Sequence, residues 1–188
     1  MGHIYLYTGT GGGKTTNALG LALRCVGHKK KVIIIQFLKW WKNIGEYKIR
    51  KLLEPYYEIY QFGRPGWIKV ESGKRKKVIK INKEKFEVRS IEELDKKLAE
   101  KALKFAEEIV KKKKPHLLVL DEINLALHWK LLDIKEVLDF LDKIPKKTHV
   151  VLTGRYAPKE LFEKADFVNL VIDKKMPKEI VTTKGIQY

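Results

Sequence analysis

A glycine-rich segment near the start of the sequence has the residue types and spacing of a phosphate-binding loop. It lies between an apolar run at residues 3–7 and a helical stretch at residues 14–27, and reads Thr8-Gly9-Thr10-Gly11-Gly12-Gly13-Lys14-Thr15-Thr16. Glycines let several backbone N–H groups converge on phosphate oxygens, and the N-terminus of the following helix adds partial positive charge. Lys14 is placed to neutralise phosphate charge, and the Thr15 hydroxyl is placed to bind Mg²⁺.

The spacing of this loop is one residue shorter than usual. Such loops place four residues between the first glycine and the Gly-Lys pair, whereas three separate Gly9 from Gly13. Either Thr8 takes the first position or the loop is a shortened variant. A turn that only caps a helix would not require Lys-Thr-Thr after its last glycine, so we interpret the segment as a nucleotide site. The predicted contacts are Gly9, Thr10, Gly11, Gly12, Gly13, Lys14, Thr15 and Thr16.

Two acidic residues follow an apolar run in the second half of the chain. The run at residues 116–120 reads as a buried strand, and Asp121 and Glu122 come directly after it. Acidic side chains at the carboxyl end of a parallel strand face the ligand crevice, where they hold Mg²⁺ or its waters. An acidic pair alone is usually a helix cap, but a phosphate loop in the same chain favours the metal role. Arg155 follows another predicted strand and is a candidate to contact phosphate or a neighbouring carboxylate.

Alternating strands and helices must position these residues. Apolar runs predict strands at residues 3–7, 32–38, 116–121, 148–153 and 167–172, and helical periodicity predicts helices at residues 14–27, 92–114, 131–144 and 158–165. The stripe expected to face the sheet from the helix at 92–114 consists of Ile91, Leu94, Leu98, Ala102, Phe105 and Ile109. The alternation predicts a mostly parallel sheet with helices on both faces. We therefore expect a single α/β domain over residues 1–188, of the P-loop NTPase-like (RecA-like) class.

Residues 39–90 interrupt the alternation. They contain three of the four tryptophans, Trp40, Trp41 and Trp67, and end in a basic stretch that we expect to form an irregular insertion at about residues 68–90. Residues 69–89 include nine Lys or Arg and three Glu. The alternation at residues 77–82 fits an exposed hairpin or edge strand, where lysines discourage association between edges. A surface for nucleic acid or an acidic ligand is the alternative interpretation of this stretch.

Composition limits the class of protein. The net charge of +17 is compatible with nucleic-acid binding, but 34 of the 40 basic residues are Lys, accompanied by 16 Glu, which is typical of hyperthermophile proteins. We attribute the charge to thermal adaptation and expect no nucleic-acid partner. Of the 188 residues 44% are hydrophobic, no apolar run approaches the ~20 residues that span a bilayer, and no secretory signal is visible. We expect a soluble cytoplasmic protein that does not contact membranes, and the single Cys25 excludes an internal disulfide.

Five segments form a combined pattern that is more specific than the loop alone. They are Tyr7-Thr8-Gly9-Thr10-Gly11-Gly12-Gly13-Lys14-Thr15-Thr16, Gln36-Phe37-Leu38-Lys39, Leu118-Val119-Leu120-Asp121-Glu122-Ile123-Asn124, Leu152-Thr153-Gly154-Arg155-Tyr156-Ala157-Pro158-Lys159-Glu160-Leu161 and Lys184-Gly185-Ile186-Gln187-Tyr188. This pattern resembles the P-loop type of ATP:corrinoid adenosyltransferase of the cobalamin pathway. The resemblance covers the chain except residues 40–90, and the family's loop, G-x-G-x-G-K-T-T, has the shortened spacing.

The resemblance implies a reaction in which a corrinoid cobalt, reduced to Co(I), attacks the 5′-carbon of ATP and expels triphosphate. Co(I) is a strong nucleophile, so the protein has to hold and orient the nucleotide and offset the charge of the leaving group. By motif match, Lys14 and Glu122 are the catalytic residues, Thr15, Asp121 and Glu122 bind Mg²⁺, and Arg155 belongs to the nucleotide site. An electron-donating reductase, a homodimer and a role in adenosylcobalamin biosynthesis or salvage are also implied.

The sequence departs from the family's pattern at two places. Thr10 and Gly12 stand where the family has Asn and Lys, which removes an amide and a charge near the phosphates. The family's Gly-Phe-x-Trp, whose rings help to displace the lower ligand of cobalt, has its nearest counterpart in Pro65-Gly66-Trp67-Ile68-Lys69. Trp67 either replaces one of those rings or packs against a loop. The alternative functions are a RecA-like ATPase that acts on nucleic acid, a kinase and a nucleotide-binding regulator.

Overall fold

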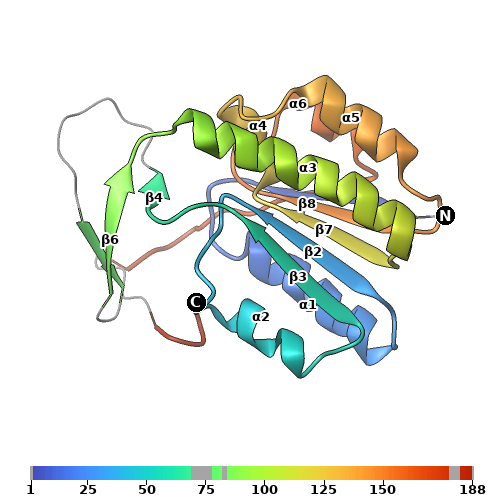
Figure 1. Ribbon diagram of the computed structural model, residues 1–188, viewed down its shortest axis with the longest axis horizontal. Helices are drawn as coiled ribbons and strands as arrows, with labels where there is room; N and C mark the ends of the chain where they lie inside the picture. The colour runs from blue at the N-terminus through green and yellow to red at the C-terminus, as the bar shows by residue number, and fades with distance from the viewer. Residues whose placement is uncertain (1, 69–77, 82–83, 178–182, 188) are drawn as a thin grey trace.

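The central sheet is parallel throughout. A computed structural model describes residues 2–68, 78–81, 84–177 and 183–187. Six strands follow the spatial order β3-β2-β7-β8-β1-β9, with parallel register between all neighbours. Their bounds are β1 (Ile4–Thr8), β2 (Val32–Phe37), β3 (Tyr57–Phe62), β7 (Leu117–Asp121), β8 (His149–Thr153) and β9 (Phe167–Leu170). Together with the helices, this sheet confirms the predicted α/β class (Figure 1).

Helices cover both faces of the sheet (Figure 1). One face carries α1 (Lys14–Gly27) and α2 (Gly45–Lys48), and a 3-10 turn, η1 (Ile49–Lys51), follows α2. The other face carries α3 (Glu93–Lys113), α4 (Ile123–His128), α5 (Ile134–Lys143) and α6 (Lys159–Lys164). Because the inner strands have a helix layer on each side, all residues of β2 and β7 are buried. No helix in the described ranges is long and apolar enough to cross a bilayer.

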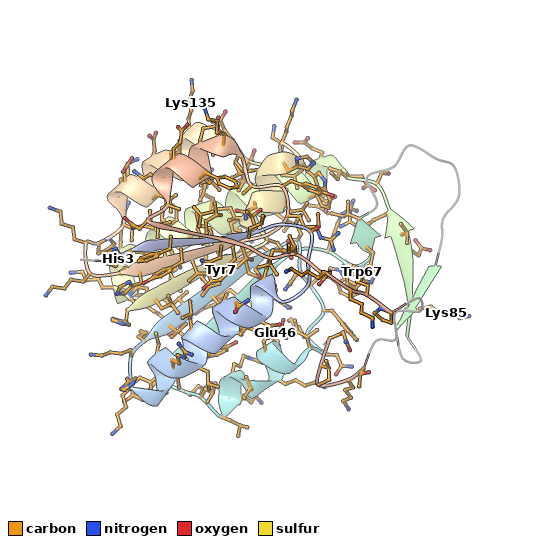
Figure 2. The ribbon with its side chains drawn as sticks, turned by 180° about the vertical axis from the view of Figure 1, so that it is seen from behind. His3, Tyr7, Glu46, Trp67, Lys85 and Lys135 are labelled. Atoms are coloured by element: carbon orange, nitrogen blue, oxygen red, sulfur yellow. The ribbon has the colours of Figure 1, made fainter. Side chains whose placement is uncertain are left out.

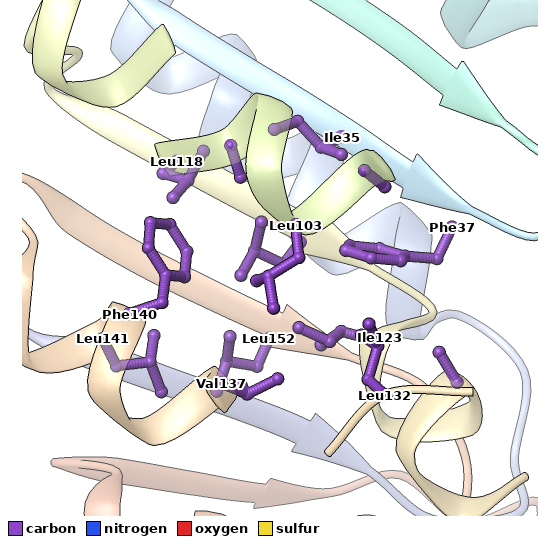
Figure 3. Packing of buried hydrophobic residues seen from close by; sticks show 14 of the residues in the cluster. Ile35, Phe37, Leu103, Leu118, Ile123, Leu132, Val137, Phe140, Leu141 and Leu152 are labelled. Atoms are coloured by element: carbon purple, nitrogen blue, oxygen red, sulfur yellow. The ribbon is translucent and has the colours of Figure 1, made fainter. Parts of the chain in front are cut away.

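The core consists of two hydrophobic layers, one on each side of the sheet. The larger layer joins the sheet to α3, α4 and α5, with Phe37, Leu103, Phe140 and Leu152 at its centre (Figure 3). In the smaller layer, Ala18 and Ala22 of α1 pack on residues of β2, β3, β7 and β8. The small side chains let α1 approach the sheet closely and fix the position of the loop that precedes it.

The buried face of α3 differs from the predicted apolar stripe. Ala102 and Ile109 are buried as expected, but Leu94 is 50% exposed. The face that packs on the sheet is made by Asp95, Ala99, Ala102, Leu103, Ala106, Ile109 and Val110. The largest apolar side chains therefore do not mark the packed face of this helix, because alanines allow a closer approach to the sheet than leucines.

The segment between β2 and α3 is more regular than the sequence predicted. It contributes β3 to the main sheet and forms a second sheet of β4 (Trp67–Ile68), β5 (Val78–Ile81) and β6 (Glu84–Arg89). β5 and β6 form an antiparallel pair, in agreement with the hairpin or edge strand expected at residues 77–82, so the described part of the expected irregular insertion at 68–90 is regular. The rest of that predicted insertion, residues 69–77 and 82–83, lies outside the described residues. The second sheet lies beside the end of the main sheet (Figure 1).

Candidate active site

The predicted site residues gather at the carboxyl ends of the parallel strands. A cleft of about 1170 Å³ opens there, next to the N-terminus of α1. Its lining includes most of the predicted residues, namely Gly11, Gly12, Gly13, Lys14, Thr15, Thr16, Trp67, Glu122 and Arg155. Gly9, Thr10 and Asp121 are not among its lining residues. Sequence segments more than a hundred residues apart thus contribute to one cleft, because parallel strands end at the same edge.

The glycines of the loop have two different tasks. Gly9 has a φ of +106°, and a Cβ on it would lie 2.3 Å from the carbonyl oxygen of Val171. A Cβ on Gly11 would lie 2.7 Å from the carbonyl carbon of Ile172, so both glycines allow the chain after β9 to pass close to the loop. In contrast, Gly12 and Gly13 face open space within the cleft. Residues 12 and 13 are therefore the ones that leave room for a ligand.

Lys14 folds back over the loop. Its side chain donates a hydrogen bond to the carbonyl oxygen of Gly11, and the residue is buried. Burial lowers the pKa of the Lys14 ammonium, while the charge of Glu122 opposes that change. The ammonium is thus held at the mouth of the loop, next to residues 12 and 13.

Asp121 is the centre of a buried hydrogen-bond network. Its Oδ1 accepts hydrogen bonds from the hydroxyls of Thr15 (2.8 Å) and Thr153 (2.6 Å). Its Oδ2 accepts from the amide of Gln36 (3.0 Å) and the ammonium of Lys39 (2.6 Å). A carboxylate has about four lone-pair sites, and all four are used here. Burial raises the pKa of Asp121, but Lys39 and the hydroxyl donors hold that pKa below its ordinary value.

Glu122 differs from Asp121 in both position and electrostatics. It caps α4 with a φ of 64°, and its backbone N–H donates to the hydroxyl of Thr153 (3.0 Å). Its side chain lines the cleft, and burial together with the charge of Asp121 raises the pKa of Glu122. Of the two acids, Glu122 is the one that faces the ligand space.

Lys39 and Glu46 are site residues that the sequence analysis did not select. The Lys39 ammonium lies 3.3 Å from the Thr15 hydroxyl and 4.0 Å from a Glu46 carboxylate oxygen, besides its contact with Asp121. Burial lowers the pKa of Lys39, but the charges of Asp121, Glu122 and Glu46 and the hydrogen bond to Asp121 together outweigh burial and raise that pKa. Lys39 belongs to a segment that was noted only as part of the family pattern. No motif pointed to Glu46, which reaches the cleft from α2.

A second hollow, of about 370 Å³, adjoins the cleft and has an aromatic lining. Four tryptophans line it: Trp40, Trp41, Trp67 and Trp129. Lys39, Glu46, Glu122 and Trp67 line both the cleft and the hollow. Trp67 is 45% exposed, and Figure 2 shows it at the end of the main sheet that is opposite to His3. We call this second cavity the tryptophan hollow.

Comparison with known proteins identifies the family. The model of the family described as ATP:corrinoid adenosyltransferase BtuR/CobO/CobP matches residues 1–188. The chain belongs to this family. A corrinoid adenosyltransferase of Sinorhizobium sp is 34% identical over 172 residues, which are 89% of this chain and 70% of that protein. That of Escherichia coli (strain K12) is 31% identical over 169 residues (89% and 75%), and that of Pseudomonas aeruginosa is 27% identical over 189 residues (100% and 84%).

Membership in the ATP:corrinoid adenosyltransferase family confirms the resemblance that the motifs indicated, and it does not favour an ATPase that acts on nucleic acid. Both departures of this adenosyltransferase from the family's pattern have a place in the structure. Gly12 lines the cleft with open space around it, whereas Thr10 is exposed outside the lining. Trp67, in the segment expected to be nearest to the family's aromatic pair, lies at the border between the cleft and the tryptophan hollow.

Proposed function

We propose that this adenosyltransferase transfers the 5′-deoxyadenosyl group of MgATP to the Co(I) of a reduced corrinoid and releases triphosphate. The observation that carries this proposal is that the phosphate-loop cleft and the tryptophan hollow share a wall. A cleft lined by the glycine loop and by the cations of Lys14, Lys39 and Arg155 suits the charged nucleotide, and an aromatic hollow suits the face of a large, flat macrocycle. Two substrates bound in adjoining cavities can bring the 5′-carbon to the cobalt.

In this proposal the loop holds the triphosphate. The backbone N–H groups at residues 12 and 13 and the cations of Lys14 and Arg155 contact phosphate oxygens. The N–H of Gly11 donates to the Val171 carbonyl oxygen (2.9 Å), and that of Gly12 has to exchange the Asp173 carboxylate (3.2 Å) for phosphate. As the cobalt–carbon bond forms, the bond between the 5′-carbon and its oxygen breaks, and the electron pair leaves with the triphosphate. These cations stabilise the charge that accumulates on the leaving group, so they act mainly in the transition state.

The residues at the loop fit a hard divalent cation such as Mg²⁺. Mg²⁺ prefers oxygen ligands and is usually bound by one or two carboxylates together with substrate phosphates. The Thr15 hydroxyl and the Glu122 carboxylate would hold the ion, which when bound neutralises charge on the phosphates. Asp121 would act through its hydrogen bond to Thr15, because all of its own acceptor positions are used.

The direct test is to incubate the protein anaerobically with MgATP and chemically reduced cobalamin or cobinamide. We expect adenosylcorrinoid and an equal amount of triphosphate, identified by absorbance and chromatography. Lys14→Ala should give no product under the same conditions, as a control for the non-enzymatic reaction. Formation of ADP and phosphate, or no corrinoid product from the wild-type protein, would contradict the proposal.

The metal assignment has its own test in nucleotide binding. Glu122→Gln keeps the size of the side chain but removes the charge, so it should abolish most of the increase in ATP affinity that Mg²⁺ produces. Affinity without Mg²⁺ should not fall. Glu160→Gln, on the exposed first turn of α6, is the matched control. Equal Mg²⁺ dependence in both variants would show that Glu122 is not a ligand.

We also propose a homodimer and an electron-donating reductase as partners. β9 is an edge strand of the main sheet, and its residues, among them Phe167, Val168 and Leu170, are exposed. An exposed apolar edge strand is a surface for pairing with another strand, and a second copy of the chain can supply that strand. Val168→Lys should therefore shift the mass in analytical ultracentrifugation from dimer to monomer. A dimer that this variant leaves intact would place the interface elsewhere.

A further inference from the structure

A buried aspartate joins the chain before Trp67 to the start of α3. The Asp95 side chain is 1% exposed and accepts hydrogen bonds from two guanidinium groups. Arg64 donates through Nε (3.2 Å) and Nη2 (3.1 Å), and Arg89 donates through Nη1 and Nη2 (both 2.7 Å). Arg64 Nη2 also lies 2.9 Å from a carboxylate oxygen of Glu92, so two cations face two anions. We call Asp95, Arg64 and Arg89 the Asp95 clamp.

The clamp reaches the backbone directly before Trp67. Arg89 Nε donates to the carbonyl oxygen of Pro65 (3.1 Å), while the same guanidinium binds Asp95. Trp67 and Ile68 then pair with Val88 and Arg89 as β4 and β6. The loop at residues 64–67 is therefore tied to α3 through charged hydrogen bonds, which are about twice as strong as neutral ones.

The other side of this loop faces the tryptophan hollow. The indole N–H of Trp40 donates to the carbonyl oxygen of Gly66 (3.3 Å). Gly66 has a φ of +107°, and a Cβ on it would lie 3.0 Å from Arg89 Cδ and 3.1 Å from the Glu87 carbonyl oxygen. The backbone before Trp67 is thus fixed from two sides, yet the Trp67 side chain is half exposed in the wall of two cavities. Because this backbone is fixed before a ligand binds, a flat ligand that packs on the ring binds with a smaller ordering cost.

We infer that the Asp95 clamp is a positioning device, which sets Trp67 as a preformed wall for the corrinoid macrocycle. The inference rests on the proposed function for the identity of the ligand. Asp95 lines neither cavity and is connected to the Trp67 loop through Arg64 and Arg89, while it also accepts the cap hydrogen bond from the Glu92 N–H. Together with Glu92, the clamp has two positive and two negative charges in contact, so it needs no bound anion to balance its arginines. The Asp95 clamp sets the position of one aromatic ring. It does not alter the conformation of the phosphate loop at the other wall of the cleft.

The kinetic test separates the two substrates. In Asp95→Asn the amide oxygen still accepts the cap hydrogen bond from the Glu92 N–H, but the charge that holds both arginines is lost. We expect the KM for the corrinoid to rise about tenfold and the KM for ATP to stay unchanged. Small misplacements of binding groups have effects of this order or larger. Asp142→Asn, which breaks an exposed ion pair with Lys164, is the matched control and should change neither KM.

A double variant tests whether Asp95 acts through the ring. Trp67→Ala alone should raise the corrinoid KM, and adding Asp95→Asn should raise it no further, because residues of one unit are not additive. If Asp95→Asn folds poorly, Arg64→Lys keeps the charge but loses the forked contact and should raise the same KM by a smaller factor. Amide hydrogen exchange at residues 66–68 should be faster in Asp95→Asn than in the wild type, whichever ligand binds.

The outcomes distinguish the inference from the proposed function. Wild-type protein that forms no adenosylcorrinoid would overturn the proposed function. An active wild type, whose corrinoid KM stays the same in Asp95→Asn and Arg64→Lys, would overturn the inference alone. Equal rises in both KM values, or additive effects in the double variant, would also overturn it, because they indicate a general loss of structure.

Discussion

The two walls of the active-site cleft are built in different ways. The nucleotide wall is one continuous segment, residues 11–16, every residue of which lines the cleft. The tryptophan hollow takes its four rings from three separate parts of the chain, at Trp40 and Trp41, Trp67 and Trp129. A site made by one loop depends on local conformation, whereas a site made by distant side chains depends on the contacts that bring them together.

Both walls nevertheless depend on a buried aspartate. Asp121 holds Thr15 and Lys39 beside the loop, and Asp95 holds the two arginines behind Trp67. Burial of an unpaired carboxylate is very unfavourable, so each aspartate stabilises the fold only while its donors are present. The difference lies in the donors: Asp121 has one cation and three neutral groups, and Asp95 has two cations and one backbone N–H. The following variants change one wall at a time.

The largest effect is expected from Lys39→Met, which leaves Asp121 buried without its cation. Breaking a buried pair by removing one partner typically costs about 3–5 kcal/mol, and we expect a loss of that order in the free energy of unfolding from urea titration. The double variant Lys39→Met with Asp121→Asn should recover part of the loss. Lys101→Met on the exposed side of α3 is the control. A loss below about 1 kcal/mol would mean that the pair is not buried.

Lys14→Ala should weaken nucleotide binding without changing corrinoid binding. Removing a charged donor from the phosphates is expected to weaken ATP binding on the order of 100-fold, measured by isothermal titration calorimetry. Binding of the corrinoid alone should be unchanged, because Lys14 does not line the tryptophan hollow. Lys101→Ala should retain wild-type affinity. If Lys14→Ala keeps its ATP affinity, the phosphates bind elsewhere.

Acid should weaken the Asp95 clamp behind Trp67. The arginines of the clamp and the Glu92 N–H lower the pKa of Asp95 to about 2, against the opposing effect of burial. Because the folded pKa lies below the ordinary value of 3.8, this contribution is present above about pH 4 and is lost as the pH falls towards 2. It amounts to about 2 kcal/mol.

Unfolding titrations between pH 5 and pH 2 measure this contribution. The free energy of unfolding of Asp95→Asn should fall less over that range than that of the wild type, by about 2 kcal/mol. Asp142→Asn, whose side chain is largely exposed, should follow the wild-type profile. Parallel profiles for Asp95→Asn and the wild type would exclude the low pKa of Asp95.

The smallest effect is expected from Gly12→Lys, which restores the residue type that the family usually has at this position. No atom lies within 4 Å of a Cβ built on Gly12, so the side chain fits without strain. An added cation near the phosphates should tighten triphosphate binding by about threefold at low salt, and less at high salt. Gly27→Lys at the other end of α1 adds the same charge away from the site as a control. No change relative to Gly27→Lys would show that position 12 does not contact phosphate.

The sequence was sufficient for the parts that local patterns specify. The loop, α1 and the strand that ends at Asp121 have strong local signals, and the structure brings Lys14, Thr15, Glu122 and Arg155 to one cleft. The sequence could not assign different roles to Asp121 and Glu122, because the hydrogen-bond donors around Asp121 come from distant segments. Glu122 and Asp121 are adjacent, and only the structure distinguishes the saturated carboxylate from the one that faces the cleft.

Features that depend on contacts between distant segments could not be predicted from local sequence patterns. β3 is an edge strand with the sequence Tyr-Glu-Ile-Tyr-Gln-Phe, which has no run of more than two consecutive apolar residues, so its pattern is weaker than the continuous apolar runs of β2 and β7. The packed face of α3 was misplaced because its alanines carry little hydrophobic signal and its buried charge, Asp95, looks like a surface residue. The partners of Asp95, at residues 64 and 89, are not marked by any motif.

Glu122 limits how far the stability of this protein can be raised. Its left-handed φ of 64° is a conformation that a glycine or an asparagine adopts more easily, at an expense of the order of 1 kcal/mol for other residues. Engineering for heat resistance would select against glutamate at this position, although the carboxylate is the acid that faces the ligand. Stabilising substitutions should therefore be sought away from the end of β7. At Glu122, the residue type that favours stability differs from the one that supplies the carboxylate for activity.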